Sequence, residues 1–239
     1  MFYDLPDPLE FVKNISEVLH PEGIWITEQS YLFAMLDTNS FDTICQEHLE
    51  YYSITAIKWI LDKADLKIIN VEFNDINGGS VCITTAHKSN IKLKEYGQLS
   101  SLLEKEKEKE LNAEFQNFRT NIENIRHQLL ELIQNTKDKG GRVFGLGAST
   151  KGNTLIQHFK LSTDHIESIG EVNPEKMGRY TPGTGIPIVN EDLLIKSKKN
   201  GDIFIVLPWH FKENFLNNPK YRGLTLVFPL PNIEIKRDV

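Results

Sequence analysis

The sequence predicts an α/β protein of two parts that a long helix joins. Two observations carry this prediction. Short apolar strands alternate with helical segments near both ends of the 239-residue chain, and a charged segment with helical periodicity separates them. The length allows one large domain or two of ordinary size. We therefore expect a first part at residues 1–92, the helix at 93–140 and a second part at 141–239.

The composition is that of a globular protein without a preference for nucleic acid. Hydrophobic residues make up 40% of the chain and the formal net charge is −6, which argues against non-specific nucleic-acid binding. No apolar run approaches the roughly eighteen residues of a membrane span, and the first residues lack the basic region of a signal peptide. The two cysteines, Cys45 and Cys82, have no metal-ligand spacing. We therefore expect a cytoplasmic protein with reduced thiols, no metal, no nucleic-acid partner and no membrane contact.

The first part is expected to hold a helix, a strand, a second helix and a hairpin. Residues 7–19 place apolar side chains at helical spacing after the helix start Asp7-Pro8. Residues 24–27 form a short apolar run that is typical of a buried strand. Ser53 is expected to cap a helix that runs to about residue 65. An antiparallel hairpin follows, with its strands at 66–73 and 80–86 and a glycine turn at 74–79.

Apolar side chains recur at three- and four-residue steps between Leu99 and Lys137, with lysine and glutamate at the other positions. This pattern predicts one long or broken helix with a charged, solvated face. A continuous helix of this length would reach about 60 Å, so we expect it to link two lobes. A coiled-coil dimer remains an alternative, although the repeat is not a strict heptad.

A second α/β unit is expected after Gly140-Gly141. Its short apolar strands alternate with helices, which predicts a mostly parallel sheet with right-handed crossovers. The strands are expected at 143–145, 166–172, 203–207 and 224–228, and the helices at 153–159 and 192–198.

The segment from Phe41 to Ser53 gathers an acid, a histidine and two tyrosines between an expected strand and an expected helix. Such junctions often lie at the mouth of an α/β sheet, where ligand sites collect. Glu47 adjoins His48, and a histidine can take a proton near neutral pH because its free pKa is close to seven. The alternative is that both are surface residues on a connecting turn.

A glycine pair, Gly145-x-Gly147, lies between a strand and a helix, where a dinucleotide-binding turn would lie, but Thr150 replaces the third glycine. Lys151 is expected near the start of that helix, which favours an anion. Glu171 ends the next strand, where such folds place a ribose-binding acid. A contact with a nucleotide phosphate and a plain tight turn remain equally open.

Two more loops of the second unit are candidates for ligand contact. His210 follows the strand at 203–207, and the strand ends of a parallel sheet point into a ligand crevice. The glycine- and proline-rich loop at 181–187 brings Tyr180 and Thr184 into consideration. The alternative for His210 is a loop histidine between packed aromatic residues. We expect these loops and the Gly147 turn to gather at one edge of the sheet.

Five stretches occur in the same order in one enzyme family. They are Phe41–Ser53 (FDTICQEHLEYYS), Asn77–Ser80, Gly145–Thr154, Thr181–Pro187 and Leu207–Phe211. Together they resemble C-methyltransferases that act on nucleotide-linked keto-sugars. The stretch LPDPLEFVKNISEVLHPEGIWITEQSYL resembles the second half of a class I methyltransferase sheet. The resemblance implies a partial class I methyltransferase sheet with a terminal antiparallel hairpin, a long linking helix and a second, Rossmann-like α/β lobe.

The resemblance also implies elements that this sequence does not contain. The family binds S-adenosylmethionine at a glycine-rich turn after its first strand and at an acid that ends the second, and a cysteine-rich zinc region precedes both. S-Adenosylmethionine is therefore expected as the methyl donor, with its binding site largely absent from this chain. Either the gene is split or truncated, or another chain supplies the N-terminal half.

The reaction implied is methyl transfer from S-adenosylmethionine to a carbon beside the ketone of a nucleotide-linked sugar. It needs a base that removes the α-proton, stabilisation of the enolate oxygen, and precise positioning. The match assigns catalysis to His48, as the base, and to Glu47. It assigns substrate binding to Tyr52, Gly78, Gly79, Ser80, Lys151, Asn153, Thr184 and His210.

The sequence departs from the family at several polar positions. Cys45 and Gln46 stand where tyrosine and histidine are usual, and Asn77 and Cys82 stand where histidine and arginine flank the glycine turn. These losses indicate a changed substrate or a lost activity, whereas Glu47 and His48 argue against complete decay. A non-catalytic nucleotide-sugar-binding module and a structural remnant are the alternatives.

Overall fold

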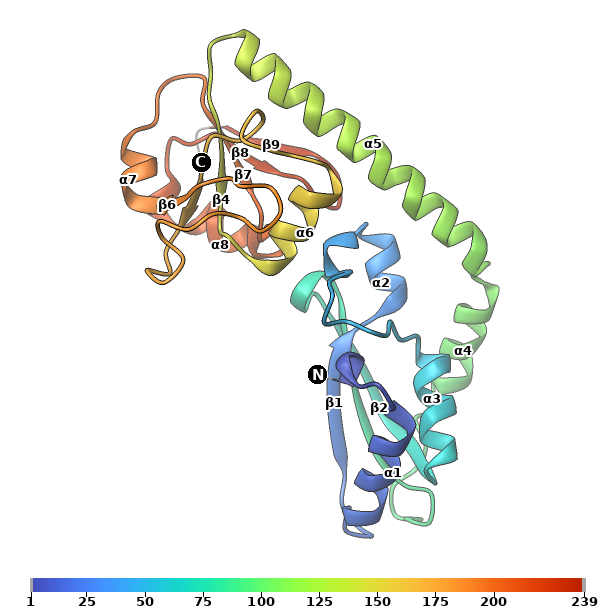
Figure 1. The fold of residues 1–239 in the computed structure, drawn as a ribbon. Helices are drawn as coiled ribbons and strands as arrows, with labels where there is room; N and C mark the ends of the chain where they lie inside the picture. The colour runs from blue at the N-terminus through green and yellow to red at the C-terminus, as the bar shows by residue number, and fades with distance from the viewer. Residues whose placement is uncertain (1, 238–239) are drawn as a thin grey trace. The chain divides into compact units, whose positions relative to one another are not determined.

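The computed structural model describes residues 2–237 and forms two compact units of mixed α/β structure (Figure 1). Unit 1 comprises the chain up to Thr38 together with Gln46–Asn117. Unit 2 comprises the chain from Phe118 onward together with Asn39–Cys45, which we call the 39–45 segment. The expectation of an α/β class is confirmed.

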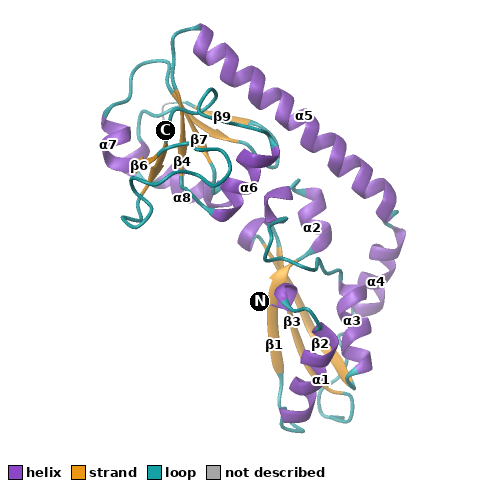
Figure 2. Ribbon diagram, viewed as in Figure 1, coloured by secondary structure: helices purple, strands orange, loops and turns teal. Residues whose placement is uncertain are grey.

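Unit 1 is built on a three-stranded sheet in the order β1-β3-β2 (Figure 2). Its strands are β1 (Trp25–Ser30), β2 (Leu66–Asn74) and β3 (Ser80–His87). Both pairs are antiparallel, with Trp25 opposite Thr85 and Ser30 opposite Ser80. The predicted hairpin of β2 and β3 is thus confirmed.

The helices of unit 1 are α1 (Pro8–Val18), α2 (Leu32–Asp37), α3 (Ile54–Lys63) and α4 (Leu99–Glu108). The expected caps are present, because the Asp7 carboxylate accepts from the Glu10 amide at 2.9 Å and the Ser53 hydroxyl accepts from the Ala56 amide at 3.1 Å. Helix α3 packs on β2 and against α1 (Figure 1). The core between these elements includes Val12, Ile54, Leu66, Val81 and Ile83.

The prediction of a buried strand at residues 24–27 is wrong. Ile24 and Ile26 are 49% and 57% exposed. Strand β1 lies at the end of the sheet, and its residues alternate between a half-buried and an exposed face. Because the first residues of this strand are consecutive apolar residues, the sequence does not show the alternation of buried and exposed side chains that an edge strand has.

The expected strand–motif–helix order also needs correction. Helix α2 and the 3-10 turn η2 (Phe41–Thr43) follow β1, so the motif begins after a helix and not after a strand. Helix α2 escaped notice because its six residues, LFAMLD, are nearly all apolar and too few to display a helical period. The motif does lead into α3, as predicted.

The long periodic segment is a broken helix. Helix α4 ends at Glu108, and α5 (Leu111–Asp138) begins after the extended residue Lys109. The division between the two units falls within α5, at Asn117 and Phe118. The buried side chains of α5 keep the three- and four-residue steps of the sequence at Phe118, Ile122, Ile125, Leu129 and Ile133.

Unit 2 is built on a six-stranded sheet in the order β6-β5-β4-β7-β8-β9. Neighbouring strands from β6 to β8 are parallel, and β9 is antiparallel to β8, so the mostly parallel sheet is confirmed. The strands are β4 (Val143–Leu146), β5 (Ile169–Glu171), β6 (Ile188–Asn190), β7 (Ile203–Val206), β8 (Leu226–Phe228) and β9 (Glu234–Lys236). The helices beside them are α6 (Thr150–His158), α7 (Glu191–Lys196) and α8 (Lys212–Asn217).

The centre of unit 2 lies at β4 and β7, whose residues are all buried. The chain places β5 and β6 on one side of β4, and β7 and β8 on the other. In open parallel sheets the crevice at such a reversal, beyond the carboxyl ends of the strands, is the usual ligand site. Here that crevice lies between the loop after β4 and the loop after β7.

A buried carboxylate links α3 and α4 in unit 1. Glu106 of α4 is 7% exposed, and its oxygens accept from the amides of Ile54 and Thr55 at 2.7 and 2.8 Å. The Tyr31 hydroxyl donates to the same carboxylate at 3.0 Å. Glu106 therefore satisfies amide groups in the first turn of α3 from a neighbouring helix, beside the local cap from Ser53.

We predict that Glu106→Ala lowers the free energy of unfolding by about 3–5 kcal/mol, because two amides and a phenol lose a charged acceptor inside the protein. Urea denaturation would measure the loss. Glu104→Ala is the control, because Glu104 is exposed on the same helix. A loss no larger than that of the control would contradict the role of Glu106.

Candidate functional site

The motif at residues 41–53 is divided between the two units, and its first half is buried in unit 2. Asp42 has no exposed surface. One carboxylate oxygen accepts the indole N–H of Trp209 at 2.8 Å, and the other has no hydrogen-bond partner among the described residues. Burial raises the pKa of Asp42, and the Trp209 hydrogen bond and the charge of Lys151 oppose that rise.

Further contacts hold the rest of the 39–45 segment in place. The Phe41 ring lies 5.0 Å from the rings of both His158 and Phe159 at the end of α6. The Asn39 amide donates to the Pro231 carbonyl at 2.9 Å. The segment therefore packs as part of the core of unit 2.

The second half of the motif is open and belongs to unit 1. Glu47 is exposed and His48 is half-buried. The His48 ring lies 4.2 Å from the Tyr3 ring, and the Tyr51 hydroxyl donates to the His48 carbonyl at 3.4 Å. Tyr52 is buried, its hydroxyl has no partner among the described residues, and burial raises its pKa to about 12. The Tyr52 phenol therefore remains a hydrogen-bond donor at neutral pH.

The glycine turn of the hairpin lines a pocket of about 340 Å³ in unit 1. Gly78, Gly79 and Ser80 border it together with Asp37 of α2. A Cβ on Gly79 would lie 2.4 Å from the Ala34 side chain, and Gly79 has a φ of +124°. The close backbone approach that this glycine permits is thus to α2.

A second polar group of residues lies at the crevice between β4 and β7. Burial lowers the pKa of Lys151, and the nearby Asp42 and Cys45 oppose that change. Burial and the charge of Lys151 lower the pKa of His210 to about 4. His210 is therefore neutral at pH 7, and its buried Nδ1 has no partner among the described residues. The structure brings Lys151 and His210 together around Asp42, a residue that sequence reasoning missed.

The turn after β4 has a packing role. Gly147 has a φ of +79°, and a Cβ there would lie 2.8 Å from the Pro208 ring. The Glu171 carboxylate, at the end of β5, accepts from the amides of Ala148, Val172 and Asn173 at 2.8–2.9 Å. The glycine and the acid therefore fix the loops around the crevice.

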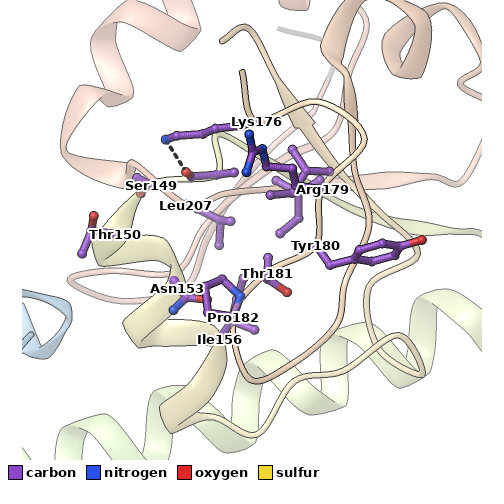
Figure 3. Close-up of a pocket in the computed structure, with 13 residues that line it drawn as sticks. Ser149, Thr150, Asn153, Ile156, Lys176, Arg179, Tyr180, Thr181, Pro182 and Leu207 are labelled. Atoms are coloured by element: carbon purple, nitrogen blue, oxygen red, sulfur yellow. Dashed lines mark hydrogen bonds between the residues drawn. The ribbon is translucent and has the colours of Figure 1, made fainter. Parts of the chain in front are cut away.

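Another pocket of unit 2, of about 310 Å³, lies between the start of α6 and the loops after β5 (Figure 3). Its polar lining includes Ser149, Asn153, Lys176, Arg179 and Thr181. The Lys176 ammonium donates to the Ala148 carbonyl at 2.8 Å, and the Tyr180 ring points away from the pocket (Figure 3). The buried Asn153 Oδ1 has no partner among the described residues. Sequence reasoning missed Lys176 and Arg179, which no motif marks.

The 181–187 loop lies near the other end of α6. The Gln157 amide donates to the Pro182 carbonyl at 2.9 Å, and the Thr181 and Thr184 hydroxyls are 2.6 Å apart. Thr184 therefore serves the shape of its own loop, and that loop contacts α6 through Gln157.

Neither glycine turn provides a cradle for S-adenosylmethionine. The space beside Gly79 is taken by Ala34, and the space beside Gly147 is taken by Pro208. Neither of these two turns therefore fits the cofactor. Within residues 2–237, no three His, Cys, Asp or Glu side chains are grouped to hold a metal, and no helix is long and apolar enough to cross a membrane.

Comparison with known proteins identifies the family. Residues 75–231, most of the chain, match the model of the C-methyltransferase C-terminal domain. The chain belongs to this family. Its match covers the glycine turn of the hairpin, the Gly147 turn, the 181–187 loop and the loop of His210. The resemblance seen in the sequence motifs is therefore confirmed.

A known relative is also similar to the residues before the hairpin, which the family model does not cover. The C-methyltransferase NovU of Streptomyces niveus is 27% identical over 235 residues, which is 96% of this chain. The same alignment covers 55% of NovU. The chain thus spans about half the length of this relative.

We predict that Asp42→Asn stabilises the protein at pH 7 relative to the native chain. The folded-state pKa of Asp42 is raised, so folding favours its protonated form, and the native chain loses stability as pH rises from the unfolded pKa through the folded pKa. Asparagine has no such loss. Urea denaturation between pH 4 and pH 8 should show an advantage of the variant that grows with pH. Parallel curves for the two proteins would contradict the raised pKa.

Proposed function

We propose that this chain takes part in C-methylation of a carbon beside the ketone of a nucleotide-linked sugar, with S-adenosylmethionine as the methyl donor. The observation that carries the proposal is the family match over residues 75–231 together with the Glu47-His48 pair in an open loop of unit 1. The NovU similarity, which includes the loop within its 96% coverage of the chain, supports the same reaction class.

In this proposal the His48 imidazole removes the α-proton of the keto-sugar, which leaves an enolate as the carbon nucleophile. Packing against Tyr3 limits how far the His48 ring can turn, while its half-buried position leaves it open to a substrate. The exposed Glu47 carboxylate orients His48 or accepts a hydrogen bond from a sugar hydroxyl. His210 is a poor alternative base because its lowered pKa, about 4, makes it a weak proton acceptor at neutral pH.

We further propose that the donor is held by the remaining portion of such an enzyme, on this polypeptide or on a separate one. The coverage of 55% of NovU and the filled space beside both glycine turns support this division. No disulfide joins Cys45 and Cys82 in the described part of the chain, which suits a reducing compartment and favours the cytoplasm as the location of the reaction.

We predict that His48→Ala slows exchange of the α-hydrogen of a nucleotide-linked keto-sugar with solvent deuterium by about 10²–10⁴-fold, the usual contribution of a general base. Proton NMR in D₂O follows this exchange on the whole chain and needs no methyl donor. His20→Ala, which removes an exposed histidine, is the control. Exchange in His48→Ala at the native rate would exclude His48 as the base.

A second candidate function is binding of the nucleotide-linked sugar by unit 2 without catalysis. The 310 Å³ pocket favours it, because Lys176 and Arg179 supply positive charge beside the polar side chains at the start of α6. Lys151 and His210 would then contribute from the neighbouring crevice.

We predict that Asn153→Leu weakens binding of a nucleoside-diphosphate sugar about tenfold, because a buried acceptor facing the ligand is lost. The fold should lose little stability, since Asn153 Oδ1 has no partner among the described residues. Calorimetric titration measures the affinity, and thermal melting measures the stability. Thr154→Val is the control, because Thr154 lines a different hollow of unit 2. Equal affinity of Asn153→Leu and the native chain would remove this residue from the site.

A further inference from the structure

We propose that Asp42 is a positioning residue, which accepts the Trp209 hydrogen bond and thereby fastens the 39–45 segment to unit 2 at the start of the loop that carries Glu47 and His48. The catalytic role of this loop rests on the proposed function, whereas the attachment of the 39–45 segment to unit 2 does not. In this view the first half of the motif is an anchor and its second half carries the chemistry.

The burial of the segment supports an anchor. Ser40, Phe41, Asp42 and Thr43 are each at most 3% exposed, while the next residue, Ile44, is 47% exposed. Exposure thus changes abruptly between Thr43 and Ile44. A segment that only connected two helices would lie at the surface along its whole length.

The contacts of the segment come from parts of unit 2 that are far apart in sequence. Trp209 follows β7, Phe159 follows α6, and Pro231 follows β8. Asn121 of α5 adds a hydrogen bond from its side-chain amide to the Asn39 side-chain oxygen Oδ1 at 3.3 Å. These partners belong to one folded core, and each contact adds to the hold on the segment.

The 39–45 segment is separated by very few residues from the loop that carries Glu47 and His48, so holding the segment also restricts the loop. Only Gln46 separates Cys45, the last residue of the segment, from Glu47. Consecutive Cα atoms are about 3.8 Å apart, so the Glu47 Cα must lie within roughly 7.6 Å of the Cys45 Cα. The fastened segment therefore limits the positions that Glu47 and His48 can reach.

The Asp42–Trp209 hydrogen bond is buried at both ends. Trp209 is 6% exposed, and its indole N–H can only donate, so it requires an acceptor at this place. The raised pKa of Asp42 means that its negative charge lowers the stability of the folded state. What Asp42 adds to stability is therefore its acceptance of the Trp209 hydrogen bond. An asparagine supplies the same acceptor, whereas a leucine of similar size does not.

The test compares four single variants and one double variant of the whole chain by NMR, well below their melting temperatures. The reporters are the His48 ring resonances, which sense the Tyr3 ring 4.2 Å away, and amide hydrogen exchange of residues 44–50. Asp42→Leu and Trp209→Phe each remove the hydrogen bond, and Asp42→Asn keeps it. Tyr221→Phe is the matched control, because it removes another buried hydrogen bond of unit 2, from the Tyr221 hydroxyl to Glu191 at 3.1 Å.

We expect Asp42→Leu and Trp209→Phe to shift the His48 resonances and to speed exchange in the loop about tenfold, the effect of one lost buried hydrogen bond. The double variant should add little to either single change, because both remove the same interaction. Asp42→Asn and Tyr221→Phe should leave the His48 resonances in place. If Asp42→Leu does not fold, Trp209→Phe tests the same bond from the donor side.

Three results would overturn the proposal. They are unchanged loop signals in both Asp42→Leu and Trp209→Phe, failure of Asp42→Asn to restore them, and an equal effect of Tyr221→Phe. None of these measurements involves methyl transfer. The test of the anchor and the test of His48 as the base are therefore independent. Either proposal can be wrong while the other is right.

Discussion

The hydrogen bond between the Trp209 indole and the Asp42 carboxylate is the interaction on which the arrangement of the motif depends. It joins residues 167 positions apart in the sequence and is buried at both ends. A buried N–H without an acceptor costs more than a hydrogen bond gains, so the core of unit 2 is completed only when the 39–45 segment is present. Unit 1 uses the same principle at Glu106, whose carboxylate completes the first turn of α3.

The two histidines of interest show how environment divides chemical roles. His210 lies beside Lys151 in a buried cluster and stays neutral at pH 7. His48 lies against Tyr3 in an open loop. A base must reach its substrate and accept a proton, whereas a neutral buried imidazole is suited to fixed hydrogen bonds. The same residue type thus lies in two environments that suit different roles.

The sequence predicts those parts of the fold whose causes are local. Helices α1 and α3 have an apolar period and a side-chain cap within three residues, and the hairpin has a glycine turn between two strands. The three-residue strands β6 and β9 show no period, so their pairing depends on the strands beside them. The candidate site also has local and non-local parts. Glu47 and His48 could be identified from a motif, whereas the importance of Asp42 depends on its contact with the distant Trp209. The sequence left the role of Gly147 open between a phosphate contact and a plain turn, and its close neighbour Pro208 lies 61 positions away.

The edge position of β1 has a consequence for the protein in solution. Among the described residues β1 pairs with β3 on one side, and Ile26 is exposed on one of its faces. Backbone groups along an open strand edge can bond to any extended segment of suitable register, and an apolar side chain beside them strengthens that attraction. Such pairing between molecules is second order in protein, so its extent rises with concentration. Pairing of this kind lowers solubility at high concentration, and lysine substitutions on that edge are the natural way to reduce it.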